Sequence, residues 1–81
     1  MKIAYAERAR KSLDNAPIAV RTALFKQLQF LTADLHHPSL RAKKYDEARD
    51  LWQGRVNRDW RFYFTIEGDT YRIQDIMSHP K

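Results

Sequence analysis

The chain has 81 residues, 43% apolar and 31% charged, with two Gly, three Pro, no Cys and a net charge of +5. This size and composition predict one folded domain over residues 1–81 and exclude a disordered chain, disulfides and thiolate metal sites. No apolar run approaches the roughly 18 residues of a membrane helix, and the charged opening residues are unlike a signal peptide, so we expect a cytoplasmic protein.

The chain is predicted to begin with a strand and a short helix. Residues 2–5 alternate and suit an edge strand, and residues 6–13 have helix-forming composition. Asn15 is then a plausible N-cap for a second helix, because its side chain can accept from a free backbone N–H. Pro17 suits the start of that helix, where its missing N–H does no harm.

Residues 17–35 are predicted to form the long helix of the protein. Its apolar stripe has spacings of four, four, three and four, and consists of Val20, Leu24, Leu28, Leu31 and Leu35. Ile18 and Phe25 are expected to widen this stripe. Phe30 lies off it, either as ordinary surface or as a contact for a partner.

The second half of the chain is predicted to be a sheet. Pro38 ends the helix because it disfavours helical backbone in the residue before it, and the polar segment 39–50 is ambiguous. The apolar period then changes to two, which predicts three antiparallel strands at residues 51–57, 60–67 and 70–78. A turn at 57–59 and a Gly68-Asp69 hairpin join these strands. The fold class is therefore α+β, with an N-terminal strand and helical hairpin packed on a C-terminal antiparallel meander.

The alternation assigns the side chains of this sheet to two faces. Trp60, Phe62, Phe64 and Ile66 share the face expected to pack on the long helix. Arg55, Arg61 and Tyr63 are then predicted to project together from the opposite, uncovered face.

The basic residues are densest in the same region. Residues 41–61 hold seven basic and four acidic side chains, with arginines interleaved among aromatic residues. This pattern favours a polyanionic partner. A solvated charged face would have the same composition, and charge alone does not separate a nucleic acid from an acidic protein or a membrane surface.

Most familiar catalytic motifs are missing from the sequence. Two isolated glycines cannot form a phosphate-binding loop, and adjacent His36 and His37 are expected at a helix C-terminus rather than on a metal. We therefore expect no cofactor and no metal. The remaining candidates for chemistry are cations and one imidazole: Arg55, Arg61, Lys43, Lys44 and His79.

Such a group suits metal-free cleavage of RNA. Guanidinium groups hold phosphate through paired hydrogen bonds and stabilise charge that develops on it, and an imidazole can transfer protons near neutral pH. The alternative is that the two arginines are ordinary surface residues and His79 belongs to a loose tail.

Two segments resemble the RelE/ParE superfamily of bacterial toxins. YAERARKSLDNAPIAVRTALFKQLQFL is similar to its N-terminal strand and helical hairpin. HPSLRAKKYDEARDLWQGRVNRDWRFYFTIEGDTYRIQDIMSHPK resembles its C-terminal half, in which a basic strand, a short turn, an Arg-containing aromatic strand, a Gly/Asp hairpin and a final basic or His-bearing strand follow in order. The resemblance covers essentially the whole chain and implies the RelE-like microbial ribonuclease fold.

The resemblance also implies roles for individual residues. Arg61 in WRFYF matches the arginine that holds the scissile phosphate, Arg55 in WQGRVN matches a basic residue on the preceding strand, and His79 stands where the YoeB-like branch has a catalytic His. The implied RNA-binding residues are Lys43, Lys44, Arg58, Tyr63 and Lys81. This chain departs from the pattern because Pro80 follows the His, and because the acidic base of the YoeB-like branch has no clear counterpart near residues 38–39. The general base is therefore not assigned.

Three functions follow from the resemblance. The first is a toxin that cleaves mRNA on the ribosome and so inhibits translation. The second is a ParE-like inhibitor of DNA gyrase without nuclease chemistry, and the third is a non-toxic homologue that binds an antitoxin. In each case the resemblance implies a cognate antitoxin protein as partner, in a hetero-oligomer, and Phe30 is one candidate contact for it.

Overall fold

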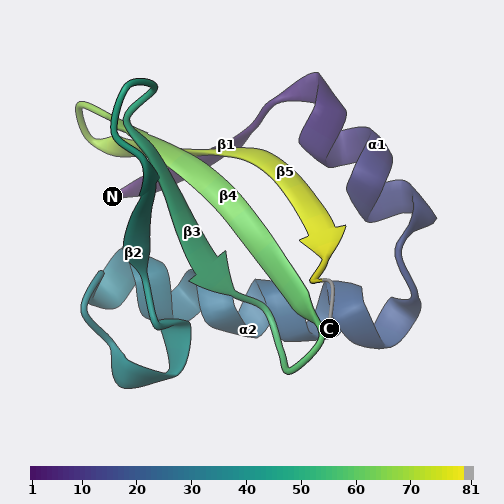
Figure 1. Ribbon diagram of the computed structural model, residues 1–81. Coiled ribbons are helices and arrows are strands. Elements are labelled where there is room, and N and C mark those ends of the chain that lie inside the picture. Colours follow the sequence, from purple (N-terminus) through teal and green to yellow (C-terminus); the bar gives the residue numbers. More distant parts are fainter. Residues whose placement is uncertain (80–81) are drawn as a thin grey trace.

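The computed structural model describes residues 1–79, which form two α-helices, one 3-10 turn and one five-stranded sheet (Figure 1). In chain order these are β1 (Lys2–Tyr5), α1 (Glu7–Asn15), α2 (Ile18–Ala33), η1 (Pro38–Leu40), β2 (Lys43–Asp46), β3 (Leu51–Arg55), β4 (Trp60–Glu67) and β5 (Thr70–Ser78). The strand order is β1-β5-β4-β3-β2. Strand β1 runs parallel to β5, and the other neighbours are antiparallel. The predicted α+β fold and the edge position of the first strand are confirmed.

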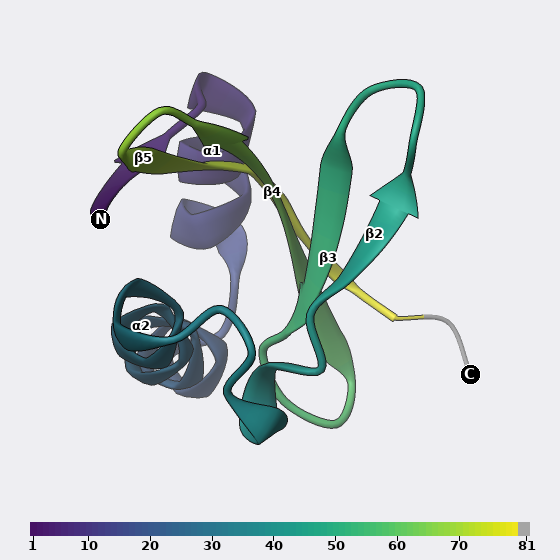
Figure 2. The ribbon, with the colours of Figure 1, turned by 90° about the vertical axis from the view of Figure 1, so that its left-hand side faces the viewer.

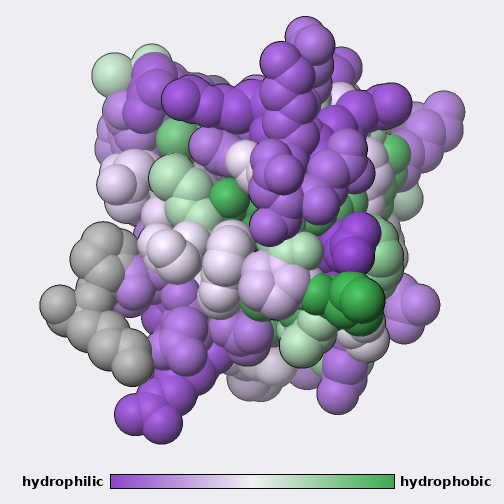
Figure 3. Space-filling view, turned by 90° about the vertical axis from the view of Figure 1, so that its right-hand side faces the viewer, coloured by the Kyte–Doolittle hydropathy of each residue, from purple (hydrophilic) through white to green (hydrophobic). Residues whose placement is uncertain are grey.

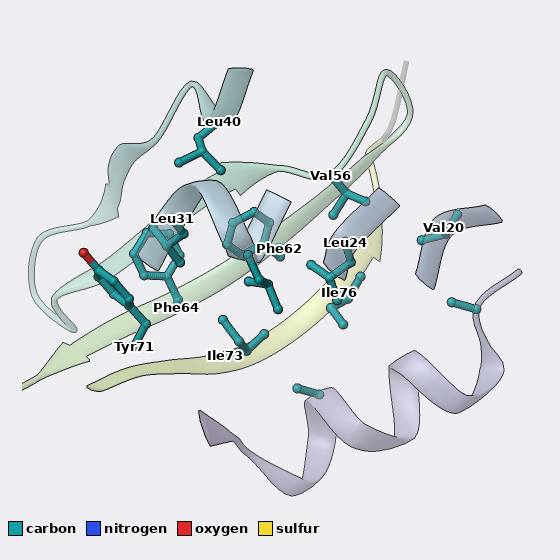
Figure 4. Packing of buried hydrophobic residues seen from close by; sticks show 13 residues of the cluster. Val20, Leu24, Leu31, Leu40, Val56, Phe62, Phe64, Tyr71, Ile73 and Ile76 are labelled. Atoms are coloured by element: carbon teal, nitrogen blue, oxygen red, sulfur yellow. The ribbon is translucent and has the colours of Figure 1, made fainter. Parts of the chain in front are cut away.

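Helix α2 packs against one face of the sheet (Figures 1 and 2). The core joins Val20, Leu24, Leu28 and Leu31 of α2 to Phe62, Phe64, Ile73 and Ile76 of β4 and β5 (Figure 4). The aromatic face of the meander therefore packs on the long helix, as predicted. The opposite face of β2, β3 and β4, which we call the open face, is not covered by this helix (Figure 2).

The stripe prediction for α2 was only partly correct. Ile18 and Phe25 do not widen the buried stripe, since they are 73% and 48% exposed. Phe30 is half-buried: it packs against the core and stacks on the ring of His37, with 4.0 Å between the ring centroids. Its position is therefore explained by packing within the chain.

The turn between the helices also differs from the prediction. Asn15 is the last residue of α1, and its side-chain amide donates to the carbonyl of Lys11. It is not the N-cap of α2, which is Pro17 and which makes no side-chain cap hydrogen bond.

The ambiguous segment contains a strand that the sequence pattern did not reveal. Strand β2 has the sequence KKYD, with no apolar alternation, and a register shift lies between Lys44 and Asp46. It is an edge strand, so packing places few demands on its composition. The open face therefore gains a row of side chains from β2.

Strands β3 and β4 approach closely at Gly54, whose Cα lies opposite that of Phe62. A Cβ at this position would lie 2.6 Å from Cε1 of the Phe62 ring, so only Gly leaves room for that fully buried side chain.

The molecular surface is predominantly polar on the side seen in Figure 3, with smaller apolar areas between the hydrophilic side chains. Within residues 1–79, no helix has the length and apolar character to cross a bilayer.

Candidate functional site

A basic cleft of about 220 Å³ lies on the open face, where β2, β3 and β4 meet the end of β5. Its lining residues are Arg41, Lys43, Gln53, Arg55, Arg61 and His79. The strand register explains this gathering, because Lys43 pairs with Gln53 and Arg55 pairs with Arg61 across adjacent strands. Cross-strand partners point to the same face of a sheet.

The two arginines are directly opposite each other and share one hydrogen-bond acceptor. The Arg55 Nε and Arg61 Nη1 groups donate to the backbone carbonyl of Asn57, at 3.2 and 2.8 Å. Arg61 Nη1 also donates to the carbonyls of Arg58 and Trp60, at 3.3 and 2.9 Å. The turn between β3 and β4 therefore fixes one edge of each guanidinium group, and both side chains are half-buried.

The turn that holds these arginines is itself ordered by a side chain. Asn57 Oδ1 accepts from the backbone N–H groups of Asp59 and Trp60, both at 3.0 Å. Asn is favoured in such turns because its side chain can bond the backbone two residues on. A sequence-local motif thus positions the cations of the cleft.

His79 lies at the cleft because the backbone that follows β5 is bonded to the turn between β3 and β4. Its N–H donates to the carbonyl of Asp59, with 2.6 Å between N and O. The imidazole is exposed and lines the cleft with Arg55 and Arg61. The three residues predicted to be catalytic are therefore brought together in space.

The electrostatics of the cleft are one-sided. It is lined by four cationic side chains and one imidazole, and no Asp or Glu among residues 1–79 lines it. The ion pairs between described residues involve other side chains, such as Lys44 with Asp50 and Arg72 with Glu67. Like charges directly opposite in a sheet repel, so a bound anion would relieve the Arg55–Arg61 repulsion.

The predicted RNA-binding residues are distributed over different surfaces. Lys43 lines the cleft. Lys44 pairs with Trp52 on the other face of the sheet, where its ammonium lies 5.2 Å from the centroid of the Trp52 ring and 2.7 Å from an Asp50 carboxylate oxygen. That hydrogen bond to Asp50 raises the pKa of Lys44. Lys44 is therefore already engaged away from the cleft.

The other predicted contacts lie beside the cleft or outside the described residues. Arg58 is exposed in the turn after β3. Tyr63 faces the open side but is buried, and its hydroxyl accepts from Gln53 Nε2 at 3.1 Å. Its ring also meets that of Tyr45 edge-on, with 5.0 Å between the centroids. Lys81 lies outside the described residues.

Sequence reasoning missed Arg41 and Gln53 as cleft residues. Arg41 has a left-handed backbone with φ of 45°, and its N–H donates to the carbonyl of Pro38 at 3.3 Å. Arg41 could not be assigned to the cleft without β2, which the sequence did not reveal. Gln53 carried a usable signal, because it alternates with Arg55 on the same predicted face.

A buried amide connects the cleft to the helix layer. Gln27 of α2 is 7% exposed, and its Nε2 donates to the carbonyls of Ser39 and Arg55, at 3.0 and 2.8 Å. Its Oε1 accepts from the Ser39 hydroxyl at 3.3 Å. One side chain thus joins α2, η1 and the end of β3, immediately behind Arg55.

The structure closely resembles solved bacterial and archaeal toxins. It matches a YoeB/ParE toxin from Agrobacterium tumefaciens with a TM-score of 0.82 and 9% identity, covering 99% of this chain and 100% of that chain. It matches the archaeal RelE–RelB complex from Pyrococcus horikoshii with a TM-score of 0.80 and 14% identity, covering 99% and 96%. A YoeB–YefM toxin–antitoxin heterotetramer from Staphylococcus aureus gives 0.79 and 12%, covering 99% and 98%.

These matches establish the fold across nearly the whole chain as that of RelE, YoeB and ParE toxins. No family model matches the sequence, and no curated protein matches it. At such low identities the likeness concerns the fold, and function has to be argued from the site.

Proposed function

We propose that this protein is the toxin of a toxin–antitoxin system and an endoribonuclease that cleaves mRNA on the ribosome. The proposal is supported by a toxin-like fold over 99% of the chain, together with a basic cleft on its open face. The observation that carries it is the pair of guanidinium groups, Arg55 and Arg61, anchored on one carbonyl beside the imidazole of His79.

The proposed reaction is a transesterification within the RNA strand. The 2′-oxygen loses its proton to solvent and attacks the adjacent phosphorus, the bond from phosphorus to the 5′-oxygen breaks, and that oxygen takes a proton. The products are a 2′,3′-cyclic phosphate and a 5′-hydroxyl, with no net gain or loss of protons. All that the protein must supply is a phosphate site, stabilisation of the added charge and a proton donor.

The cleft residues fit these roles. Arg61 holds the scissile phosphate, because three backbone carbonyls fix its Nη1 edge and leave its planar fork with other donors for an anion. Arg55, which donates to the same Asn57 carbonyl as Arg61, stabilises the charge on the pentavalent phosphate. His79 gives its proton to the 5′-oxygen.

The test is single-turnover cleavage of ribosome-bound mRNA. Arg61→Gln and His79→Gln should each lower the rate by about 10²–10³, the usual loss when one preorganised donor is removed. Arg61→Lys should lose nearly as much, because an ammonium keeps the charge but cannot make the same set of hydrogen bonds. Arg10→Gln on α1, an exposed site outside the cleft, is the control for net charge. Variants with unchanged melting temperature and wild-type rates would remove these roles.

A gyrase inhibitor is the second candidate, because one similar structure is named as a YoeB/ParE toxin. Such an inhibitor needs no proton donor, and the imidazole in the cleft favours the nuclease. A DNA supercoiling assay run beside the translation assay separates the two, since a gyrase inhibitor blocks supercoiling and leaves mRNA intact.

The proposed system includes an antitoxin as partner. Two of the similar structures are complexes of RelE with RelB and of YoeB with YefM. An acidic segment covering the basic cleft would block access and neutralise its charge, so the affinity of the complex should fall with added salt.

A further inference from the structure

A second hollow adjoins the basic cleft and shares two of its walls. This outer groove, of about 500 Å³, is lined by Lys26 of α2, Gln27, Ser39 and Arg58, and also by Arg41 and Arg55, which line the basic cleft too. The two hollows are therefore adjacent, because Arg41 and Arg55 line both of them.

The outer groove is cationic like its neighbour. Lys26, Arg41, Arg55 and Arg58 line it, and no Asp or Glu in the described part of the chain does. Within residues 1–79 no ion pair engages these four side chains. Asp59 belongs to the same turn as Arg58, and its backbone carbonyl binds the His79 N–H, but it does not line the groove.

The backbone at Arg41 is held in an uncommon conformation at this junction. Its φ of 45° is in the left-handed region, which non-Gly residues seldom adopt. The hydrogen bond from its N–H to Pro38, and the amide of Gln27 on the neighbouring Ser39 carbonyl, fix the loop that carries it. The fold thus keeps a cation between the two hollows at a conformational cost.

We propose that the outer groove binds a second backbone phosphate of RNA, next to the phosphate held in the basic cleft; this rests on the proposed function. Besides its cations the groove is lined by polar Gln27, Ser39 and Asn57 and by the small apolar residues Ala23, Pro38 and Val56, and no aromatic residue in the described part of the chain lines it. Protein interfaces are usually anchored by buried aromatic residues, whereas surfaces that bind nucleic acid are polar and strongly basic. The site therefore suits a phosphate chain better than an amphipathic peptide.

The test is the salt dependence of RNA binding by Lys26→Gln/Arg58→Gln. The probe is an oligoribonucleotide long enough to span both hollows, with 2′-O-methyl groups that prevent cleavage. Losing one phosphate contact should reduce the slope of log K against log salt by about 0.7, which corresponds to about fivefold in affinity at 0.1 M salt. The double variant removes two cations from the site of that one phosphate, so it should bind about fivefold more weakly at that salt concentration and show a slope reduced by about 0.7.

The control is Arg10→Gln/Lys11→Gln, which removes the same net charge from α1 and should leave the slope near the wild-type value. A reduced slope with the free oligonucleotide assigns the phosphate to the mRNA strand, and weaker binding to ribosomes alone assigns it to ribosomal RNA. Unchanged affinity for both would overturn the proposal. Weaker binding of polyglutamate with unchanged RNA binding would also overturn it, in favour of an acidic protein.

Failure of this proposal can be told apart from failure of the proposed function. If the wild-type protein leaves ribosome-bound mRNA uncut but the groove variant shows a reduced salt slope, the second phosphate site stands and the proposed nuclease activity is wrong. If the wild-type protein cuts mRNA but the groove variant binds RNA as the wild type does, the nuclease activity stands and the second phosphate site is wrong.

Discussion

The buried amide of Gln27 gives the sharpest prediction about how the helix layer supports the cleft. In Gln27→Met the side chain keeps a similar length and suits a buried position, but it can no longer make the hydrogen bonds to Ser39 and Arg55. The carbonyls of Ser39 and Arg55 are then left without a buried donor, so the cost arises from unsatisfied polar groups rather than from a cavity.

The magnitude follows from the two carbonyls. A buried polar group left without its partner costs about 1–3 kcal/mol, and two coupled groups that can partly relax toward water should cost about 2–4 kcal/mol together. For a domain of this size each kcal/mol lowers the melting temperature by about 4–8 °C. We therefore expect Gln27→Met to lower the melting temperature by roughly 8–32 °C.

The assay is urea unfolding followed by tryptophan fluorescence, with Gln29→Met as the matched control. Gln29 is on the same helix but exposed, so the same chemical change there should alter the free energy of unfolding by less than about 0.5 kcal/mol. Equal stabilities for the two variants would refute the reasoning. A Gln27→Met protein that remains folded at low temperature should also cleave more slowly, because the end of β3 behind Arg55 is no longer fixed.

Three further predictions concern the sheet, a phenol and the turn. Gly54→Ala should destabilise the protein by about 1–3 kcal/mol in urea, because the new methyl group meets the buried Phe62 ring; a smaller loss would show that the ring can move aside. Burial raises the pKa of Tyr71, and the carboxylate of Asp34 adds to this rise. The stability from the neutral phenol is therefore complete below about pH 10 and falls as the pH rises through the folded-state pKa, so Tyr71→Phe should flatten the alkaline loss of melting temperature. Asn57→Ala should cost about 1–2 kcal/mol and lower the cleavage rate, whereas unchanged kinetics would show that the arginines do not depend on this turn.

The fold could be predicted well wherever the apolar pattern was strong. Apolar residues recur every three or four positions in the long helix and every second position in the strand with Phe62 and Phe64. The structure has a helix and strands at these places. The pattern could not reveal β2, because an edge strand with one polar face and a register shift has no alternation to detect. It also misplaced Ile18 and Phe25, because helical periodicity does not show how wide a strip of the helix surface the sheet covers.

The candidate site was predictable in part for the same reason. Cross-strand register alone places Arg55 opposite Arg61, so their meeting could be predicted from the alternation. The separation of Lys43 from Lys44 follows from the same rule, but only once the segment is known to be a strand. The contributions of Arg41 and Gln27 depend on a loop conformation and on long-range hydrogen bonds, which leave no local mark in the sequence.

The most direct measurement of the central claim is the chemistry of RNA ends after wild-type protein acts on ribosome-bound mRNA. The account predicts fragments with a 5′-hydroxyl and a 2′,3′-cyclic phosphate, and their loss in Arg61→Gln. Intact mRNA in the presence of folded wild-type protein, or fragments with a 5′-phosphate, would contradict it.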